Sequence, residues 1–124
     1  MTPSKLVLAS KSASRRAMLD AAGVAYEAIP ADIDERAIEA SLKGASPPEI
    51  AEALSVAKAA ALAAPNPKWL VLGSDSLVVV DGKRFDKPTS RENAAEHLCF
   101  FSGKPLELHS AAALVRGNTC VWSA

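Results

Sequence analysis

The chain has 124 residues, which is enough for one domain with a hydrophobic core but too few for two. Hydrophobic residues make up 49% of the chain, and this share excludes an intrinsically disordered protein. The 14 basic and 14 acidic side chains give a formal net charge of zero, so the excess of Lys and Arg expected of a nucleic-acid-binding protein is missing. A polyanion could bind only where basic residues are gathered locally.

Cysteine use and hydrophobic runs indicate a cytoplasmic protein. Cys99 and Cys120 show neither a CxxC nor a Cys/His spacing, so no zinc site is indicated, and we interpret both as small buried residues in a reducing compartment. The apolar run near the N-terminus is too short for a signal peptide, and no stretch is long enough to span a bilayer. We expect neither a nucleic-acid nor a membrane partner.

Short strands and helices alternate in the first half of the chain. An apolar helix face formed by Met18, Leu19 and Ala22 is followed by Gly23, which suits the residue after a helix end. The elements expected here are a strand at 5–9, a serine-rich turn at 10–12, a helix at 13–22, a strand at 26–29 and a short helix within 32–42, ended near Gly44.

The clearest helix signal begins at Ser46. Ser46 suits the N-cap, Pro47 the first helical position, and Glu49 completes a capping box, so a helix is predicted to about Ala64. The elements expected after it are a buried strand at 69–72 that enters the segment 73–76, a continued extended segment at 77–80, a hairpin turn at 81–82 with a return at 84–85, a helix at 90–101, a strand at 106–115, a turn at 117–118 and a final strand from 119.

The last predicted strand has only six residues after its turn, 119–124. We therefore interpret residues 1–124 as one domain that lacks its C-terminal part. The long apolar strand at 106–115 is expected to expose an unpaired edge, which favours aggregation and, at best, weak activity.

A candidate anion site follows the first strand. Ser10, Ser12 and Ser14 are interleaved with Lys11 and followed by two arginines where a helix begins, so hydroxyls, guanidinium groups and free helix N–H groups coincide. The simpler alternative is an N-cap serine followed by solvated arginines.

Asp75 is the candidate acid, because it is predicted at the end of an apolar strand, where a carboxylate can hold metal or activate water. A turn aspartate that caps its own backbone is the alternative. Lys58 and Lys87 are candidate phosphate partners or ordinary surface cations. Together these groups suit a triphosphate with a divalent metal. No Walker A or GxGxxG motif occurs, and His97 and His109 are expected to pack or to face solvent.

These residues resemble the Maf family of nucleoside triphosphate pyrophosphatases. The matching segments occur in family order over nearly the whole chain: LVLASKSASRRAML, PADIDER, the lysine of LSVAKAAAL, VLGSDSLVVVDG, DKP and FSGKPLELHSAAAL. The resemblance implies an α/β fold with an elongated mixed sheet, flanking helices and a cleft between two lobes. It also implies hydrolysis of nucleoside triphosphates to monophosphate and pyrophosphate.

The resemblance assigns roles residue by residue. Asp75 would take the proton from the attacking water, directly or through a metal, and Glu35 would help to hold that metal, Mg or Mn. Two further positions, Ser14 and Ser76, would contact the base. Both are small here, so no base is assigned, although the spacing before the arginines is similar to that of the branch acting on methylated guanosine triphosphate. The phosphates would be bound by Ser10, Ser12, Arg15, Arg16, Lys58 and Lys87.

Two other functions stay open at this point. The first is a nucleotide-binding regulator of cell division without turnover, and the second is a phosphatase of simple monoesters. A homodimer is compatible with the sequence.

Overall fold

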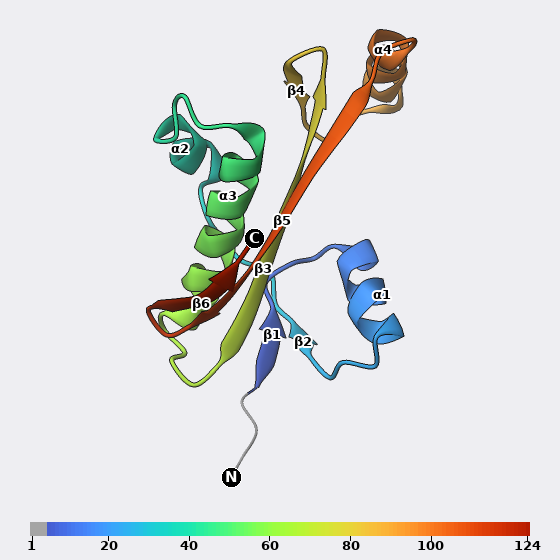
Figure 1. The fold of residues 1–124 in the computed structure, drawn as a ribbon. Helices are drawn as coiled ribbons and strands as arrows, with labels where there is room; N and C mark the ends of the chain where they lie inside the picture. The colour runs from blue at the N-terminus through green and yellow to red at the C-terminus, as the bar shows by residue number, and fades with distance from the viewer. Residues whose placement is uncertain (1–4) are drawn as a thin grey trace.

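The computed structural model describes residues 5–124 as a mixed sheet of six strands with four helices (Figure 1). The strand order is β2-β1-β3-β5-β6, and β4 pairs separately with β3. The elements are β1 (Leu6–Leu8), α1 (Ala13–Ala21), β2 (Glu27–Ala28), α2 (Glu35–Ala40), α3 (Pro47–Ala63), β3 (Leu70–Val80), β4 (Lys83–Phe85), α4 (Arg91–Phe101), β5 (Leu106–Arg116) and β6 (Thr119–Ser123).

Two long antiparallel strands, β3 and β5, form the axis of the molecule (Figure 1). They pair over eleven residues each, from Leu70 opposite Arg116 to Val80 opposite Leu106. The prediction that the buried strand ends at residue 72, which would place Asp75 just after a strand end, is therefore wrong. Burial alternates along β3 through this segment: Gly73, Asp75 and Leu77 are buried, whereas Ser74 and Ser76 are not. The strand can therefore continue through polar residues, because every second residue still packs against the core side.

The other strands leave a gap along one side of β3. β1 runs parallel to β3 only at residues 70–72, and β4 is antiparallel to β3 only at residues 78–80. Within the described chain, no strand pairs with residues 73–77 on that side. We call this segment the notch, and it places Asp75 at an open sheet edge in the middle of a strand.

Helix α3 covers one face of the sheet at very short range. Its capping box is formed as predicted: Ser46 accepts from the Glu49 N–H, and the Glu49 carboxylate accepts from the Ser46 N–H at 3.4 Å. Gly73 permits the close approach, because a Cβ there would lie 2.0 Å from the backbone oxygen of Ser55. The apolar core between helix and sheet comprises Val7, Ala9, Ala59, Ala63, Val71 and Val115.

The short helices contribute little to the core. Helix α1 ends before Gly23 as predicted, and Gly23 has a φ of +71°. None of the residues of α1 is buried, and Met18 is 71% exposed. Of the predicted apolar face, Met18 and Ala22 are thus exposed and only Leu19 is half-buried. Helix α2 also has no buried residue. None of the helices among residues 5–124 is long and apolar enough to cross a membrane.

Two predictions about the last third of the chain need correction. Strand β5 is not a free edge along its length, because β6 pairs with residues 113–116, whereas residues 106–111 have β3 as their only described partner strand. Cys99 and Cys120 are exposed rather than buried, because they lie on α4 and β6, outside the core.

Candidate active site

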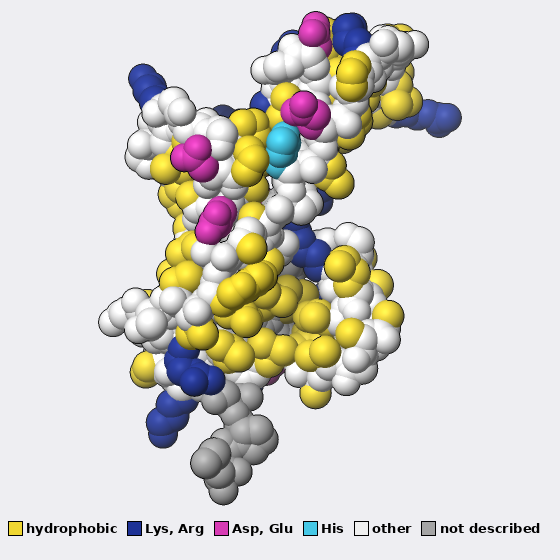
Figure 2. Space-filling model, in the orientation of Figure 1, with side chains coloured by type: hydrophobic (Ala, Val, Ile, Leu, Met, Phe, Trp, Pro, Cys, Tyr) yellow, Lys and Arg dark blue, Asp and Glu magenta, His cyan; other side chains and the backbone are white. Residues whose placement is uncertain are grey.

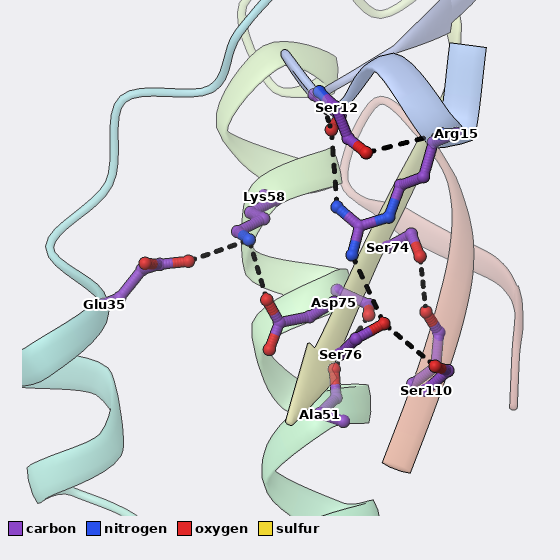
Figure 3. Close-up of polar contacts among 12 residues, drawn as sticks. Ser12, Arg15, Glu35, Ala51, Lys58, Ser74, Asp75, Ser76 and Ser110 are labelled. Atoms are coloured by element: carbon purple, nitrogen blue, oxygen red, sulfur yellow. Dashed lines mark hydrogen bonds and ion pairs between the residues drawn. The ribbon is translucent and has the colours of Figure 1, made fainter. Parts of the chain in front are cut away.

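Three charged side chains meet at the notch. Asp75 comes from the middle of β3, Lys58 from α3 and Glu35 from the first residue of α2. The Lys58 Nζ atom lies 2.9 Å from Asp75 Oδ1 and 2.8 Å from Glu35 Oε1, so the ammonium group bridges the two carboxylates (Figure 3). The structure therefore brings the predicted acid, the predicted metal ligand and one predicted phosphate partner into a single cluster.

Burial and the two neighbouring carboxylates act in opposite directions on the pKa of Lys58. Burial alone lowers the pKa of Lys58, but hydrogen bonds to Glu35 and Asp75, with their negative charges, outweigh it and raise the pKa above its ordinary value of 10.5. Lys58 is consequently charged at neutral pH. Asp75 is 8% exposed, and its Oδ2 atom has no hydrogen-bond partner among residues 5–124. A buried carboxylate oxygen in that condition is suited to bind a cation or a water molecule.

The loop after β1 supplies hydroxyl groups to the notch, and the first turn of α1 supplies a guanidinium group. The Ser10 hydroxyl accepts from the Ser12 N–H at 3.0 Å and from Arg15 Nη1 at 3.4 Å, and the Ser12 hydroxyl caps α1 by accepting from the Arg15 N–H at 3.3 Å. The second Arg15 nitrogen, Nη2, donates to the Ser76 hydroxyl at 3.5 Å (Figure 3). The start of α1 thus combines an N-cap serine with an arginine that reaches across to β3.

Side-chain alternation places the two halves of the site on opposite faces of β3. Asp75 points to the α3 face, whereas Ser74 and Ser76 point to the other face. They belong to one site because the sheet is interrupted there. In a strand, the backbone N–H and C=O groups of every second residue point to the same side. Those of Leu70 and Leu72 bond to the chain segment of β1, so those of Ser74 and Ser76 point into the notch.

The notch opens into a cleft of about 1000 Å³. In Figure 2 the surface is indented between the part that contains α1 and the part that contains α4, with basic side chains visible at the indentation. Lys87 lines the cleft, whereas Arg16 is exposed and does not line it. The polar residues that line it are Ser12, Ser14, Arg15, Glu35, Arg36, Glu39, Lys58, Ser74, Asp75, Ser76, Arg84, Asp86, Lys87, His97 and Ser110.

Sequence reasoning missed three of these residues. Ser110 on β5 lies opposite Ser76, and their hydroxyl oxygens are 2.9 Å apart. Arg84 on β4 forms an ion pair with Glu39 on α2. A serine in a strand and charged residues in a short helix and a hairpin carry no signal by themselves, since only strand register and helix placement bring them together.

The carboxylates of the cluster fit a divalent cation that is shared with a substrate. Glu35 and Asp75 provide hard oxygen ligands, and Asp75 Oδ2 is unpartnered within residues 5–124. No group of three or more His, Cys, Asp or Glu side chains in this part of the chain is arranged to hold a metal. Two carboxylates plus phosphate oxygens are the usual surroundings of Mg²⁺ at nucleotide sites.

The arrangement of strands and helices is similar to that of a solved structure. The chain is similar to the crystal structure of a nucleoside-triphosphatase/dITP/XTP pyrophosphatase from Mycobacterium abscessus, with a TM-score of 0.50 and 20% sequence identity. The match covers 97% of this chain and 67% of that one. At this identity the likeness supports the fold class, an α/β protein with an elongated mixed sheet.

Sequence comparison then gives the family. The model of the family described as Maf-like protein matches residues 5–123, and the chain belongs to this family. It is 45% identical to a 7-methyl-GTP pyrophosphatase of Mesorhizobium japonicum, over 95% of this chain and 60% of that protein. It is 43% identical to a nucleoside triphosphate pyrophosphatase of Rhodopseudomonas palustris HaA2, over 98% and 60%. The chain thus spans about three-fifths of the length of these relatives.

Proposed function

We propose that the protein hydrolyses nucleoside triphosphates between the α- and β-phosphates and releases a nucleoside monophosphate and pyrophosphate. The observation that carries this proposal is the cluster of Asp75, Lys58 and Glu35, which faces the Ser12–Arg15 loop across the notch. A carboxylate beside cations and hydroxyl groups suits the hydrolysis of a polyphosphate, and the proposal is supported by relatives named as pyrophosphatases that are 43% and 45% identical in sequence.

The cationic groups would bind and orient the triphosphate. Arg15 offers a forked donor, and Ser12 adds a hydroxyl group at the start of α1, where helix N–H groups favour an anion. Lys87 extends the positive charge along the cleft. Ser10 would act mainly by orienting Arg15, because its hydroxyl oxygen is near Arg15 Nη1.

Asp75 would act as the base. A water molecule held at Asp75 Oδ2 would transfer a proton to Oδ2 while the water oxygen forms a bond to the α-phosphorus. The bridging P–O bond then breaks, and pyrophosphate leaves with the bonding electrons. A divalent cation bound through Glu35 and Asp75, Mg²⁺ or Mn²⁺, would withdraw charge from the phosphate oxygens.

The base would lie beside Ser14 and Ser76. Both serines line the cleft, and their small side chains leave space there. Because the relatives include proteins named for 7-methyl-GTP and others named for nucleoside triphosphates in general, both standard and methylated bases are candidates. The proposed site of action is the cytoplasm, where nucleoside triphosphates are found.

The test is product analysis on a panel of standard and 7-methylated nucleoside triphosphates with Mg²⁺ or Mn²⁺. Monophosphate and pyrophosphate in equal amounts are expected. Diphosphate and inorganic phosphate would place the cleavage elsewhere. Tight nucleotide binding without any product would favour the binding-only regulator, and release of phosphate from monoesters alone would favour the monoester phosphatase.

A further inference from the structure

The residue Glu35 sits on a helix that is weakly held. Helix α2 has only six residues, and none of them is buried, so packing does little to fix its position. Its N-cap, Asp34, accepts from the Ala37 N–H. This bond stabilises the helix itself but does not connect it to the rest of the molecule. Some other contact has to hold Glu35 against Lys58.

Two acidic residues on one side of α2 face the cleft. Glu35 and Glu39 are four residues apart and therefore project from the same face of the helix. The first is bonded to Lys58 and the second forms an ion pair with Arg84. The Glu39 and Arg84 side chains are 25% and 35% exposed, so water screens this pair less than it screens a pair on the open surface.

Arg84 connects α2 to the opposite rim of the cleft. It lies on β4, opposite Val79 of β3, and precedes Lys87 by three residues. Its guanidinium group also lies 3.5 Å from Asp86. The ion pair therefore ties the helix that carries Glu35 to the hairpin that leads to Lys87.

We propose that the Arg84–Glu39 ion pair is a positioning clasp that holds Glu35 at Lys58 and Asp75 across the cleft. The inference rests on the proposed function, since it assigns Arg84 an indirect part in that reaction. Arg84 acts through α2 and does not itself bind a phosphate. Breaking the clasp releases α2, so Glu35 leaves the cluster and its share in metal binding is lost.

Three variants test the clasp: Arg84→Gln, Glu39→Gln and the exchanged pair Arg84→Glu/Glu39→Arg. The control is Glu27→Gln, which removes the ion pair between Lys5 and Glu27 at the other end of the sheet. Millisecond hydrogen exchange of peptides covering 35–40 reports on α2 directly. Mn²⁺ binding without nucleotide, followed by electron paramagnetic resonance, reports on the carboxylates. Steady-state kinetics with Mg²⁺ give kcat and KM separately.

Both single variants are expected to speed exchange in α2 and to weaken Mn²⁺ binding by about three- to tenfold. In both, kcat should fall while KM for the nucleotide changes little, the exchanged pair should recover much of the loss, and the control should match the parent protein. Unchanged exchange in α2 would overturn the proposal. The proposal would also be overturned if Arg84→Gln raised KM while Glu39→Gln matched the parent protein in exchange, Mn²⁺ binding and kinetics. That result would make Arg84 a direct ligand of the substrate. Absence of pyrophosphate release from the parent protein would contradict the proposed function, whereas exchange and Mn²⁺ binding would still decide on the clasp.

Discussion

At the scale of single residues, the two oxygens of the Asp75 carboxylate have different environments. Oδ1 accepts from Lys58 at 2.9 Å, while Oδ2 is buried and has no hydrogen-bond partner in the described chain. The lysine contacts one carboxylate oxygen and leaves the other without a contact to it. One oxygen is therefore fixed by the protein, and the other is left for water or metal.

Replacing Asp75 by Asn tests this division. The change keeps the size of the side chain but removes the charge, so we expect turnover to fall by roughly 10² to 10⁴. The fold should be retained, which circular dichroism can check, and nucleotide affinity should change much less than kcat. Near-normal turnover in this variant would rule out Asp75 as the base.

Lys87 and Arg16 differ in position although the family resemblance assigns both to phosphate binding. Lys87 lines the cleft and Arg16 does not, so Lys87→Ala should weaken triphosphate binding more than Arg16→Ala does. A lost charge-assisted hydrogen bond is worth about 1.5–3 kcal/mol. Calorimetric titration with a triphosphate and the corresponding monophosphate provides the measurement. Equal losses for both ligands would identify Lys87 as an ordinary surface cation.

At the scale of elements, the contact between α3 and β3 positions Lys58 relative to Asp75. The helix backbone approaches the strand at Gly73, where any side chain would collide with the carbonyl oxygen of Ser55 and the backbone nitrogen of Ala59. Ser55 is itself buried and donates to the Ala51 carbonyl at 2.8 Å. The helix cannot move away without breaking the bridge from Lys58 to Asp75.

Gly73→Ala should therefore affect both stability and the site. The added methyl group has to displace backbone rather than a flexible side chain, so we expect a loss of about 1–3 kcal/mol or more in the free energy of unfolding. Chemical denaturation measures it. Gly23→Ala is a useful control, because its methyl group meets no atom within 4 Å and its cost is limited to the strain of a positive φ. Equal effects at both positions would contradict the proposed close packing.

At the scale of the whole molecule, apolar side chains are exposed along the strands farthest from β1. Leu106 and Leu108 on β5 are 51% and 62% exposed, and Val121 and Trp122 on β6 are 57% and 51% exposed. β6 ends the order of the described sheet, so its outer backbone groups can pair with another chain. An apolar, unpaired edge favours self-association.

Residues 1–124 expressed alone are predicted to associate with increasing concentration and to unfold at a low temperature. Val121→Lys places a charge on the edge strand and should shift the population toward monomer. Sedimentation velocity over a range of concentrations measures the shift, and Lys11→Gln, a change on an exposed residue of another loop, serves as control. A monomeric parent protein with a high, sharp melting transition would contradict the predicted association.

Local signals in the sequence determined the elements that depend on their near neighbours. The helix beginning after Ser46 forms because the capping box and Pro47 act within one turn, and the hairpin at Asp81 and Gly82 forms because both residues take a positive φ. The ordered motifs determined the family, which the match over residues 5–123 confirms. Each of these features is encoded in a few consecutive residues or in their order.

Only the tertiary structure decided how the site is assembled. Asp75 lies in the middle of a continuous strand, and it lines the cleft although it is buried, because β1 stops pairing after residue 72 and β4 starts at residue 78. The contact of Arg15 with Ser76 spans 61 positions, and that of Ser76 with Ser110 spans 34. Such contacts depend on strand register and on the placement of α1 and α2, neither of which buries a residue. The polar contacts that these helices make across the cleft leave no periodic pattern in the sequence.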